Sequence, residues 1–198
     1  MRDGFKRKIL DLSYEHKLSH IGSCLSAVEI IDEIYSKKKP DEKFVLSSGH
    51  MNLALQVVLK ERGLIDEISF ETHPDRNQKG VDCTTGSLGH GLPIAVGMAL
   101  ADRTKNVYCL ISDGECAEGS MWEAVRIAGE QRLDNLKIYV NANGLSAYGK
   151  TDVKQIRNLF KIYGIPAKIV KTSVEPLEGL LAHYEILTKE RYEKIIHK

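Results

Sequence analysis

A strand-helix-strand unit within residues 106–146 constrains the fold of this chain more than any other feature. The apolar run NVYCLI is followed by a helical stretch over about residues 120–132 and by a second apolar run, LKIYV. About forty residues suffice for two parallel strands joined by a crossover helix. Because such crossovers are right-handed, the carboxyl ends of both strands meet at one edge of the sheet. We therefore predict an α/β fold with a mainly parallel sheet flanked by helices.

The rest of the chain continues this alternation. We predict helices over residues 5–18, 25–35, 51–62 and 92–102, the second capped by Ser23 or Ser26, strands over residues 43–48 and 165–172, and a charged helix or pair of helices over residues 178–198. Because no repeat or flexible linker interrupts this order, we predict one domain over residues 1–198.

Composition and charge exclude several classes of partner. The 28 Lys and Arg residues against 27 Asp and Glu leave a net charge of +1, so there is no electrostatic case for binding nucleic acid or a membrane surface. No apolar run reaches the roughly 18 to 20 residues of a membrane span. The amino terminus has the pattern of an amphipathic charged helix and not of a signal peptide. We expect a cytoplasmic protein whose four cysteines form neither a disulfide nor a zinc site.

Polar residues follow both strands of the strand-helix-strand unit. Asp113 comes after the first strand and Asn143 after the second, so we expect them side by side at the sheet edge. Their oxygens, with the backbone carbonyl of Leu145, suit a hard divalent cation, and Gly114 lets a phosphate approach the backbone. Taken alone, Asp-Gly and Asn-Gly are more often simple turns. Their joint position predicts a clamp for Mg²⁺ and a diphosphate, with Asp113 an exposed acid that contributes little to the core.

Four motifs resemble those of the transketolase family of thiamine diphosphate enzymes. The pair SDG and NAN is similar to the family signature of glycine-aspartate-glycine followed some thirty residues on by asparagine, and DGECAEGSMWEA resembles transketolases in particular. Three further motifs agree in order and spacing: KLSHIGSCLSAVEI, FVLSSGH and GVDCTTGSLGHGLPIAVGMALA. The resemblance covers about residues 5–150. It implies the amino-terminal, diphosphate-binding module of a transketolase.

The resemblance assigns roles to matching positions. It implies that Asp113, Asn143 and the carbonyl of Leu145 hold Mg²⁺, or Ca²⁺ or Mn²⁺ in its place. It implies that thiamine diphosphate is contacted by His50, Gly86, Leu88, Gly114, Glu115 and Asn143. It makes His20, His73 and Glu118 the candidate catalytic residues, the histidines facing the sugar and Glu118 joining a carboxylate network toward the partner subunit, with Glu123 a weaker candidate.

The histidine assignments agree with the chemistry of ketol transfer. The C–C bond that breaks lies beside a hydroxyl, whose proton leaves and later returns, and imidazoles titrate near neutral pH. A histidine is otherwise most often a surface or structural residue. His20, His50 and His73, however, lie in separate loops and each neighbours Gly, Ser or Pro. Arg76 is a candidate for binding a substrate phosphate, but a solvated loop charge is the simpler interpretation.

Three departures from the family pattern stand out. Ser112 replaces the first glycine of the signature, which requires a strand-like backbone there, and Asn141 stands where many relatives carry an acid. The chain is shortened between Asp152 and Ile165, which affects the completeness of the sheet. LLAHYEILTKERYEKII resembles the family's terminal segment, and His183 is its candidate for a histidine near the diphosphate.

The family binds its cofactor between two domains, and 198 residues leave no room for the second. We therefore expect a second subunit that carries the pyrimidine-binding and C-terminal domains, in an α₂β₂ assembly. Only the assembly is expected to transfer a two-carbon unit from a ketose to an aldose. Two alternatives are a subunit of another thiamine diphosphate enzyme that transfers acyl or aldehyde groups, and a non-catalytic paralogue.

Overall fold

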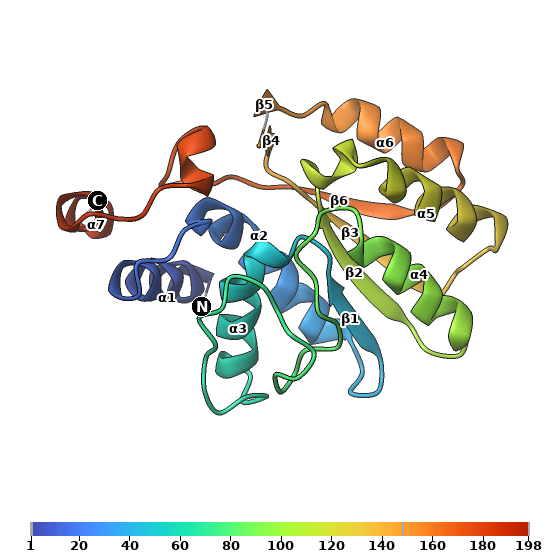
Figure 1. Cartoon of the computed structure of the whole chain (residues 1–198), viewed down its shortest axis with the longest axis horizontal. Coiled ribbons are helices and arrows are strands. Elements are labelled where there is room, and N and C mark those ends of the chain that lie inside the picture. Colours follow the sequence, from blue (N-terminus) through green and yellow to red (C-terminus); the bar gives the residue numbers. More distant parts are fainter. Residues whose placement is uncertain (1, 148, 198) are drawn as a thin grey trace.

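A four-stranded parallel sheet forms the centre of the molecule (Figure 1). The structure is a computed structural model and describes residues 2–147 and 149–197. The strand order is β1 (Lys43–Leu46), β2 (Val107–Ser112), β3 (Leu136–Ala142) and β6 (Ala167–Lys171). β2 and β3 are parallel neighbours, as the strand-helix-strand unit predicts. The predicted fold class is therefore confirmed.

Helices cover both faces of the sheet (Figure 1). On one face lie α1 (Arg2–Glu15), α2 (Ile21–Lys37) and α3 (Asn52–Glu61); on the other lie α4 (Gly91–Ala101), α5 (Gly119–Glu130) and α6 (Val153–Ile162). Shorter elements complete the chain: η1 (Gly49–Met51), η2 (Glu115–Ala117), the hairpin β4 (Leu145–Ser146) and β5 (Gly149–Lys150), η3 (Leu180–His183) and α7 (Lys189–Ile196). Within the described ranges, no helix is long and apolar enough to cross a bilayer.

Alternate residues of each strand enter two separate cores, because successive side chains point to opposite faces of a sheet. Tyr108 and Leu110 of β2 pack toward α1–α3, whereas Cys109 and Ile111 pack toward α4–α6. All six residues of β2 are buried. Burial on both faces explains why this strand is a continuous apolar run and shows no alternation in the sequence.

The predicted capping of the second helix is wrong. α2 begins earlier, at Ile21, so Ser23 and Ser26 lie inside the helix instead of preceding it. The Oγ of Ser26 donates to the carbonyl of Ser23 and accepts from the amide nitrogen of Asn141, while Ser23 bonds His183. The hydroxyl of Ser26 therefore bonds the sheet edge, and the hydroxyl of Ser23 bonds the carboxyl-terminal segment. Neither hydroxyl caps the helix.

The shortened stretch between Asp152 and Ile165 still completes the four-stranded sheet. It forms α6, whose N-cap Asp152 accepts from the amides of Lys154 and Gln155, and β6 follows. The terminal segment forms the pair η3 and α7, in agreement with one of the two forms expected. The hairpin β4–β5 was not predicted.

Close backbone approaches fix the segments that surround the sheet edge. A Cβ placed on Gly91 would clash with the Cα of Ser47, and one placed on Gly22 would lie 2.7 Å from the Cβ of Ala182. Neither position leaves room for a side chain. Gly91 thus allows the start of α4 to pack closely against the end of β1. Gly22 allows η3, which carries His183, to pack closely against the start of α2.

Candidate functional site

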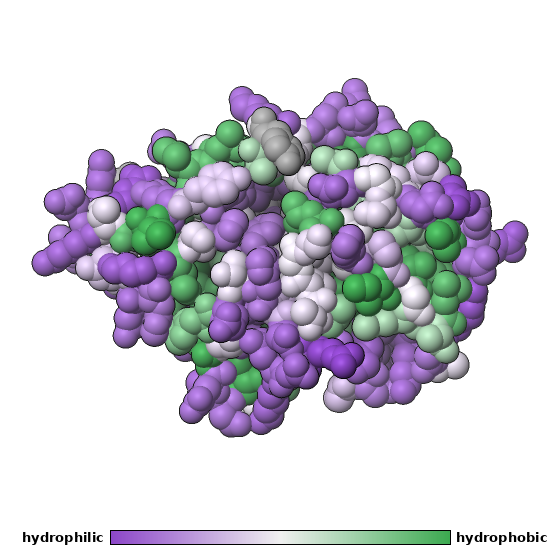
Figure 2. Space-filling view, viewed as in Figure 1, coloured by the Kyte–Doolittle hydropathy of each residue, from purple (hydrophilic) through white to green (hydrophobic). Residues whose placement is uncertain are grey.

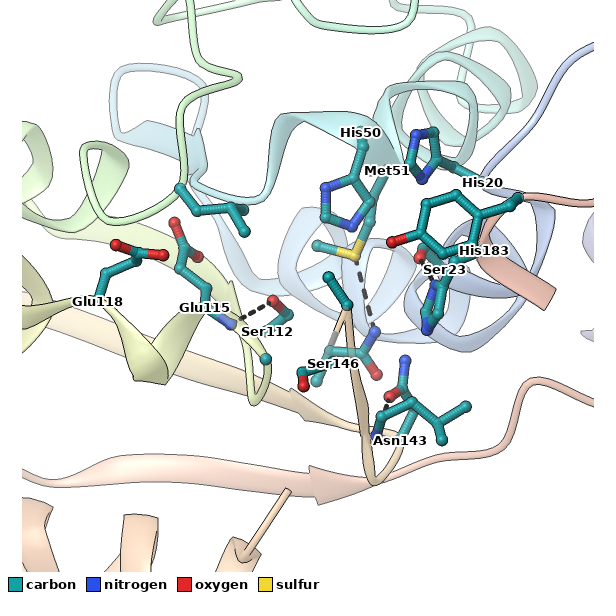
Figure 3. Close-up of a pocket in the computed structure, with 16 residues that line it drawn as sticks. His20, Ser23, His50, Met51, Ser112, Glu115, Glu118, Asn143, Ser146 and His183 are labelled. Carbon is teal, nitrogen blue, oxygen red and sulfur yellow. Dashed lines mark hydrogen bonds between the residues drawn. The ribbon is translucent and has the colours of Figure 1, made fainter. Parts of the chain in front are cut away.

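A cavity of about 150 Å³ lies at the carboxyl edge of the sheet, where the polar residues were predicted to meet (Figure 3). In Figure 3, His20, His50 and His183 lie on one side, Glu115 and Glu118 on the other, and Asn143 and Ser146 beneath. These side chains come from the residue before α2, from η1, η2 and η3, from the residue before α5, from the turn after β3, and from β4. Segments far apart in the sequence therefore build one site.

The structure brings most of the predicted site residues together. The cavity is lined by His20, His50, Leu88, Gly114, Glu115, Glu118, Asn143 and Leu145. Three predicted residues do not line it: Gly86, His73 and Asp113. His73 is exposed, and its ring packs on Gly86, where a Cβ would lie 3.0 Å from the ring. Asp113 lies beneath the cavity, bonded to the turn that carries Asn143.

Asp113 binds the turn after β3 directly. Its Oδ2 accepts the backbone amide of Gly144 at 2.8 Å and the hydroxyl of Thr151 at 2.6 Å. Its Oδ1 accepts the amide of Gly114 at 3.1 Å. The Oδ1 of Asn143 accepts the amide of Leu145 at 3.0 Å, and the carbonyl oxygen of Leu145 would lie 3.2 Å from a Cβ on Gly114. The oxygen-bearing groups predicted to hold a cation therefore gather around one turn.

The expectation that Asp113 is an exposed acid is wrong. Only 2% of the residue is exposed, because the hairpin β4–β5 folds back over the end of β2 and brings Thr151 to the carboxylate. Burial raises the pKa of Asp113, although its three hydrogen bonds act in the opposite direction. Asp113 consequently stabilises the local structure through its hydrogen bonds, in addition to any ligand that it binds.

The donor set around Asp113 fits a hard divalent cation. Burial disfavours the charged carboxylate, and Asp113 forms no ion pair within the described part of the chain. A carboxylate oxygen has two lone-pair sites, and Oδ1 uses one of them for Gly114. A bound cation would stabilise the buried charge. Across residues 2–147 and 149–197, no group of three or more His, Cys, Asp or Glu side chains is placed to hold a metal; the predicted set has one such side chain, an amide and a carbonyl.

Glu115 is the centre of a buried hydrogen-bond network. Its carboxylate is fully buried and accepts the hydroxyls of Ser47 at 2.7 Å and Ser48 at 2.9 Å and the amide of Gly89 at 2.8 Å. Burial raises the pKa of Glu115 despite these bonds. Ser112, the residue that replaces the signature glycine, ends β2 in strand conformation, and its hydroxyl oxygen lies 2.8 Å from that of Ser48. Glu115 thus joins the end of β1, the glycine-rich loop before α4 (residues 80–90) and the end of β2.

Glu118 differs from Glu115 although both line the cavity. It is half-buried at the start of α5, and its carboxylate forms no hydrogen bond or ion pair with any residue that the structure describes. Glu123, the weaker candidate, is exposed, is absent from the cavity wall and pairs with Arg126. Glu118 therefore has a carboxylate available to a ligand or a partner, whereas Glu123 is engaged on the surface.

Three imidazoles form the opposite wall. The ring centroids of His20 and His50 lie 5.0 Å apart. Burial lowers the pKa of His50 to about 3, with a further contribution from the other histidines. Burial also lowers the pKa of His20 and of His183. The lowered pKa values favour the neutral form of all three rings at pH 7, and each neutral ring has one nitrogen that can accept a hydrogen bond.

The backbone of His20 is in the left-handed region, with φ of 59° and ψ of 24°. This conformation is uncommon outside glycine and costs of order 1 to 3 kcal/mol. It is held in place because the amide of His20 donates to the carbonyl of His183 at 2.9 Å. The strain directs the start of α2 toward the cavity, as is common at functional sites.

His183, suggested by the weak terminal resemblance, lies in the cavity wall. Its Nδ1 bonds the hydroxyl of Ser23 at 2.7 Å, and its Nε2 is buried with no partner in the described structure. An unpartnered buried nitrogen beside a cavity is a position for a ligand contact. Sequence reasoning missed Ser23, Met51, Ser146 and Tyr184 as lining residues. No local pattern indicates them, because they meet only through tertiary contacts such as Gly22 with Ala182.

The lowered pKa of His50 predicts a loss of stability in mild acid. The unfolded chain takes up this proton near pH 6.5, whereas the folded chain does so only near pH 3, so the free energy of unfolding falls as the pH falls below 6.5. The contribution of His50 is about 2 kcal/mol between pH 6.5 and pH 5, at 1.36 kcal/mol per pH unit. Urea titrations should therefore show that His50→Gln loses about 2 kcal/mol less than the wild type over this interval. Equal losses in both proteins, with His90→Gln as the exposed control, would contradict this.

Comparisons with known proteins agree with this geometry. The profile of a family described as transketolase, thiamine diphosphate binding domain, matches residues 14–172. The chain is 32% identical to an apulose-4-phosphate transketolase subunit of Phocaeicola vulgatus, over 74% of this chain and 61% of that protein. It is 37% identical to the 6-deoxy-6-sulfo-D-fructose transketolase subunit SqwG of a Clostridium species, over 68% of this chain and 58% of that protein.

Longer relatives and a solved structure show the same similarity. Human transketolase is 35% identical over 73% of this chain and 27% of its own length. The crystal structure of transketolase from Campylobacter jejuni superimposes with a TM-score of 0.80, at 21% identity, over 98% of this chain and 41% of that one. The chain therefore spans about three fifths of the relatives named as subunits and about a quarter of the human protein.

Proposed function

Because the chain belongs to the family of transketolase thiamine diphosphate binding domains, we propose that it is the diphosphate-binding subunit of a split transketolase. The reaction is the transfer of a two-carbon ketol unit from a ketose to an aldose, with thiamine diphosphate and Mg²⁺. The observation that carries the proposal is the cavity itself, which has neutral imidazoles on one wall and carboxylates on the other above the turn shared by Asp113 and Asn143. We take residues 1–198 as one domain and the cytoplasm as its location.

The residues around the turn would hold the cofactor. Asp113, Asn143 and the carbonyl of Leu145 would bind Mg²⁺, and the amide of Gly114 and His50 would contact the diphosphate. Leu88 and Gly86 would contact the rings. When bound, the thiazolium ring of thiamine diphosphate stabilises the carbanion, so the protein supplies orientation and proton transfer.

Proton transfer would fall to the imidazole wall. A neutral imidazole accepts a proton from a substrate hydroxyl and later returns it. His20 is half-buried in this wall, and the Nε2 of His183 has no partner in the described structure. His73 lies outside the wall, exposed beside the glycine-rich loop, where a bound sugar would reach it.

A second polypeptide is part of this proposal. The relatives that match over most of this chain include proteins named as transketolase subunits, which supports a partner subunit here too. The partner would carry the pyrimidine-binding and C-terminal domains, and two copies of each chain would form an α₂β₂ assembly. Glu118, whose carboxylate has no partner in the described structure, would face the assembled site.

His73 tests the assignment of roles within the site. We expect His73→Ala to leave the affinity for thiamine diphosphate unchanged and to lower kcat about 10²- to 10⁴-fold, because the residue would contact substrate and not cofactor. Calorimetry gives the affinity, and a coupled ketol-transfer assay gives kcat. His90→Ala, an exposed histidine at the start of α4, is the control. A loss of cofactor affinity in His73→Ala would place this residue at the cofactor instead.

Reconstitution tests the function as a whole. The purified chain is mixed with the transketolase subunit that co-purifies with it and is assayed with ketose phosphates and with 2-oxo acids. We expect turnover of ketose phosphates by the mixture and none by either protein alone. Activity of this chain alone would contradict the split enzyme. Turnover of 2-oxo acids only would favour an acyl-transferring relative, and failure to bind thiamine diphosphate in the mixture would favour a non-catalytic paralogue.

A further inference from the structure

Ser26 is a polar residue in the buried interior of the molecule. Hydrophilic side chains cover much of the surface in Figure 2, whereas Ser26 is only 3% exposed. It lies inside α2 and does not line the cavity at the sheet edge. A buried hydroxyl in a helix interior needs hydrogen-bond partners. Because Ser26 does not touch the cavity, any role that it has in the site acts through these partners.

The hydroxyl of Ser26 bonds three other residues. It donates its hydrogen to the backbone carbonyl of Ser23 at 3.0 Å, since a carbonyl only accepts. Its oxygen accepts from the Nδ2 of Asn141 at 2.9 Å and from the Nδ2 of Asn143 at 3.3 Å. One hydrogen and two lone pairs are therefore all in use. Ser26 thus joins α2 to the end of β3 and to the turn that follows it.

The side-chain amide of Asn143 is held at both ends. Its Nδ2 donates to Ser26, and its Oδ1 accepts the backbone amide of Leu145 at 3.0 Å. A backbone amide only donates, and the hydrogen of Ser26 is already bonded, so both partners require the same orientation of the asparagine. The Oδ1 of Asn143 therefore faces the turn, and its second lone pair remains for a cation.

Asn141 fits the same arrangement. It is fully buried, its Nδ2 also contacts the Sδ of Met51 at 3.6 Å, and its Oδ1 accepts the hydroxyl of Thr172 at 2.5 Å. An ionised acid at this position would have no hydrogen to donate to Ser26. It would instead compete with the carbonyl of Ser23 for the hydrogen of Ser26. The asparagine that departs here from the family pattern therefore matches the orientation of the Ser26 hydroxyl.

We propose that Ser26 is a positioning residue that holds the amide oxygen of Asn143 toward the cation of the cofactor. The proposal rests on the proposed function and deepens it by adding a residue behind the metal ligands. Without the hydroxyl of Ser26, the Nδ2 of Asn143 loses its acceptor, and the amide is able to rotate away from the turn. Removing a residue that orients a metal ligand typically weakens metal binding roughly 10- to 100-fold.

Titration of the assembled subunits with Mn²⁺, in the presence of thiamine diphosphate, measures the affinity for the cation by electron paramagnetic resonance. We expect Ser26→Ala to raise the Kd of Mn²⁺ about 10-fold or more. Ser13→Ala is the matched control and should leave this Kd unchanged. Ser13 is also a buried helical serine, but its hydroxyl has no partner in the described structure. Normal Mn²⁺ affinity in Ser26→Ala, or an equal loss in Ser13→Ala, would overturn the proposal.

A double-mutant cycle with Asn143→Asp separates orientation of the ligand from support of the fold. A carboxylate has two oxygens, so either orientation presents one to the cation. In the Asn143→Asp background, Ser26→Ala should therefore change the Kd of Mn²⁺ less than about 3-fold. An effect as large as in the wild-type background would show that Ser26 only supports the fold, and would overturn the proposal. Normal Mn²⁺ affinity in Asn143→Ala would contradict the cation site itself, and this inference with it.

Hydrogen exchange of side-chain amides, followed by nuclear magnetic resonance, tests the hydrogen bond itself on the purified chain without metal or cofactor. The Nδ2 hydrogens of Asn143 should exchange at least about 10-fold more slowly in the wild type than in Ser26→Ala. Asn135, whose Nδ2 donates to three backbone carbonyls, does not line the cavity and is the internal reference. Its exchange should be the same in both proteins. Equal exchange of Asn143 in both proteins would overturn the proposal.

Discussion

Replacing Asp113 with Asn is expected to lower the Mg²⁺-dependent affinity for thiamine diphosphate at least about 100-fold, the largest effect on binding that we predict. The substitution removes the buried charge that a cation would stabilise but keeps the shape of the side chain. With the amide oxygen of asparagine at the position of Oδ2, the amide of Gly144 and the hydroxyl of Thr151 keep their acceptor, and only the bond from the amide of Gly114 is lost. Calorimetry of the chain with its partner subunit, with Mg²⁺ and then with EDTA, gives the affinity.

Two comparisons make this result specific. Asp113→Ala should lose the same affinity and also about 2 to 3 kcal/mol of the free energy of unfolding, because the buried amide of Gly144 is left unpaired. Asp134→Asn, at an exposed acid between α5 and β3, should change neither quantity. Normal cofactor affinity in Asp113→Asn would show that this carboxylate is not a metal ligand.

Glu115→Ala is expected to produce the largest loss of stability, about 3 to 5 kcal/mol. The fully buried carboxylate accepts three hydrogen bonds that tie β1, β2 and the glycine-rich loop together. Its removal leaves the hydroxyl of Ser47 and the amide of Gly89 without this acceptor, whereas the hydroxyl of Ser48 still has Ser112 as a partner. Urea unfolding followed by circular dichroism measures the change in the free energy of unfolding.

The matched control lies three residues away on the same cavity wall. Glu118→Ala should cost less than about 1 kcal/mol, because that carboxylate is half-buried and has no partner in the described structure. Glu115→Gln should fall between the two, since serine hydroxyls are able to reorient toward an amide. If Glu115→Ala and Glu118→Ala were equally destabilised, Glu115 would not be the structural centre of this edge.

The sheet and its carboxyl edge were predictable because their signals are local. A continuous apolar run such as β2 is the pattern of a strand buried on both faces, and Asp113 and Asn143 each directly follow such a strand. The right-handed crossover then brings the two strand ends together without further information. The motifs around His20 and His50 likewise lie at the ends of helices and strands. The position of these histidines in space therefore follows from their position in the sequence.

Contacts between distant segments were not predictable. Thr151 reaches Asp113 only because the hairpin β4–β5 folds back over the end of β2. Each strand of this hairpin has only two residues, so no strand pattern in the sequence marks β4 or β5. The bond between Ser23 and His183 joins residues 160 positions apart and depends on the contact of Gly22 with Ala182. The early start of α2 follows from the left-handed backbone of His20, which propensity disfavours.

The central claim is that Asp113 and Asn143 together hold the cation that carries the diphosphate. Anomalous diffraction from crystals of the assembled subunits grown with thiamine diphosphate and Mn²⁺ tests it most directly. We predict one manganese peak bounded by these two side chains and the carbonyl of Leu145, beneath the wall of His20, His50 and His183. A manganese peak elsewhere, with thiamine diphosphate bound and this turn empty, would contradict the account.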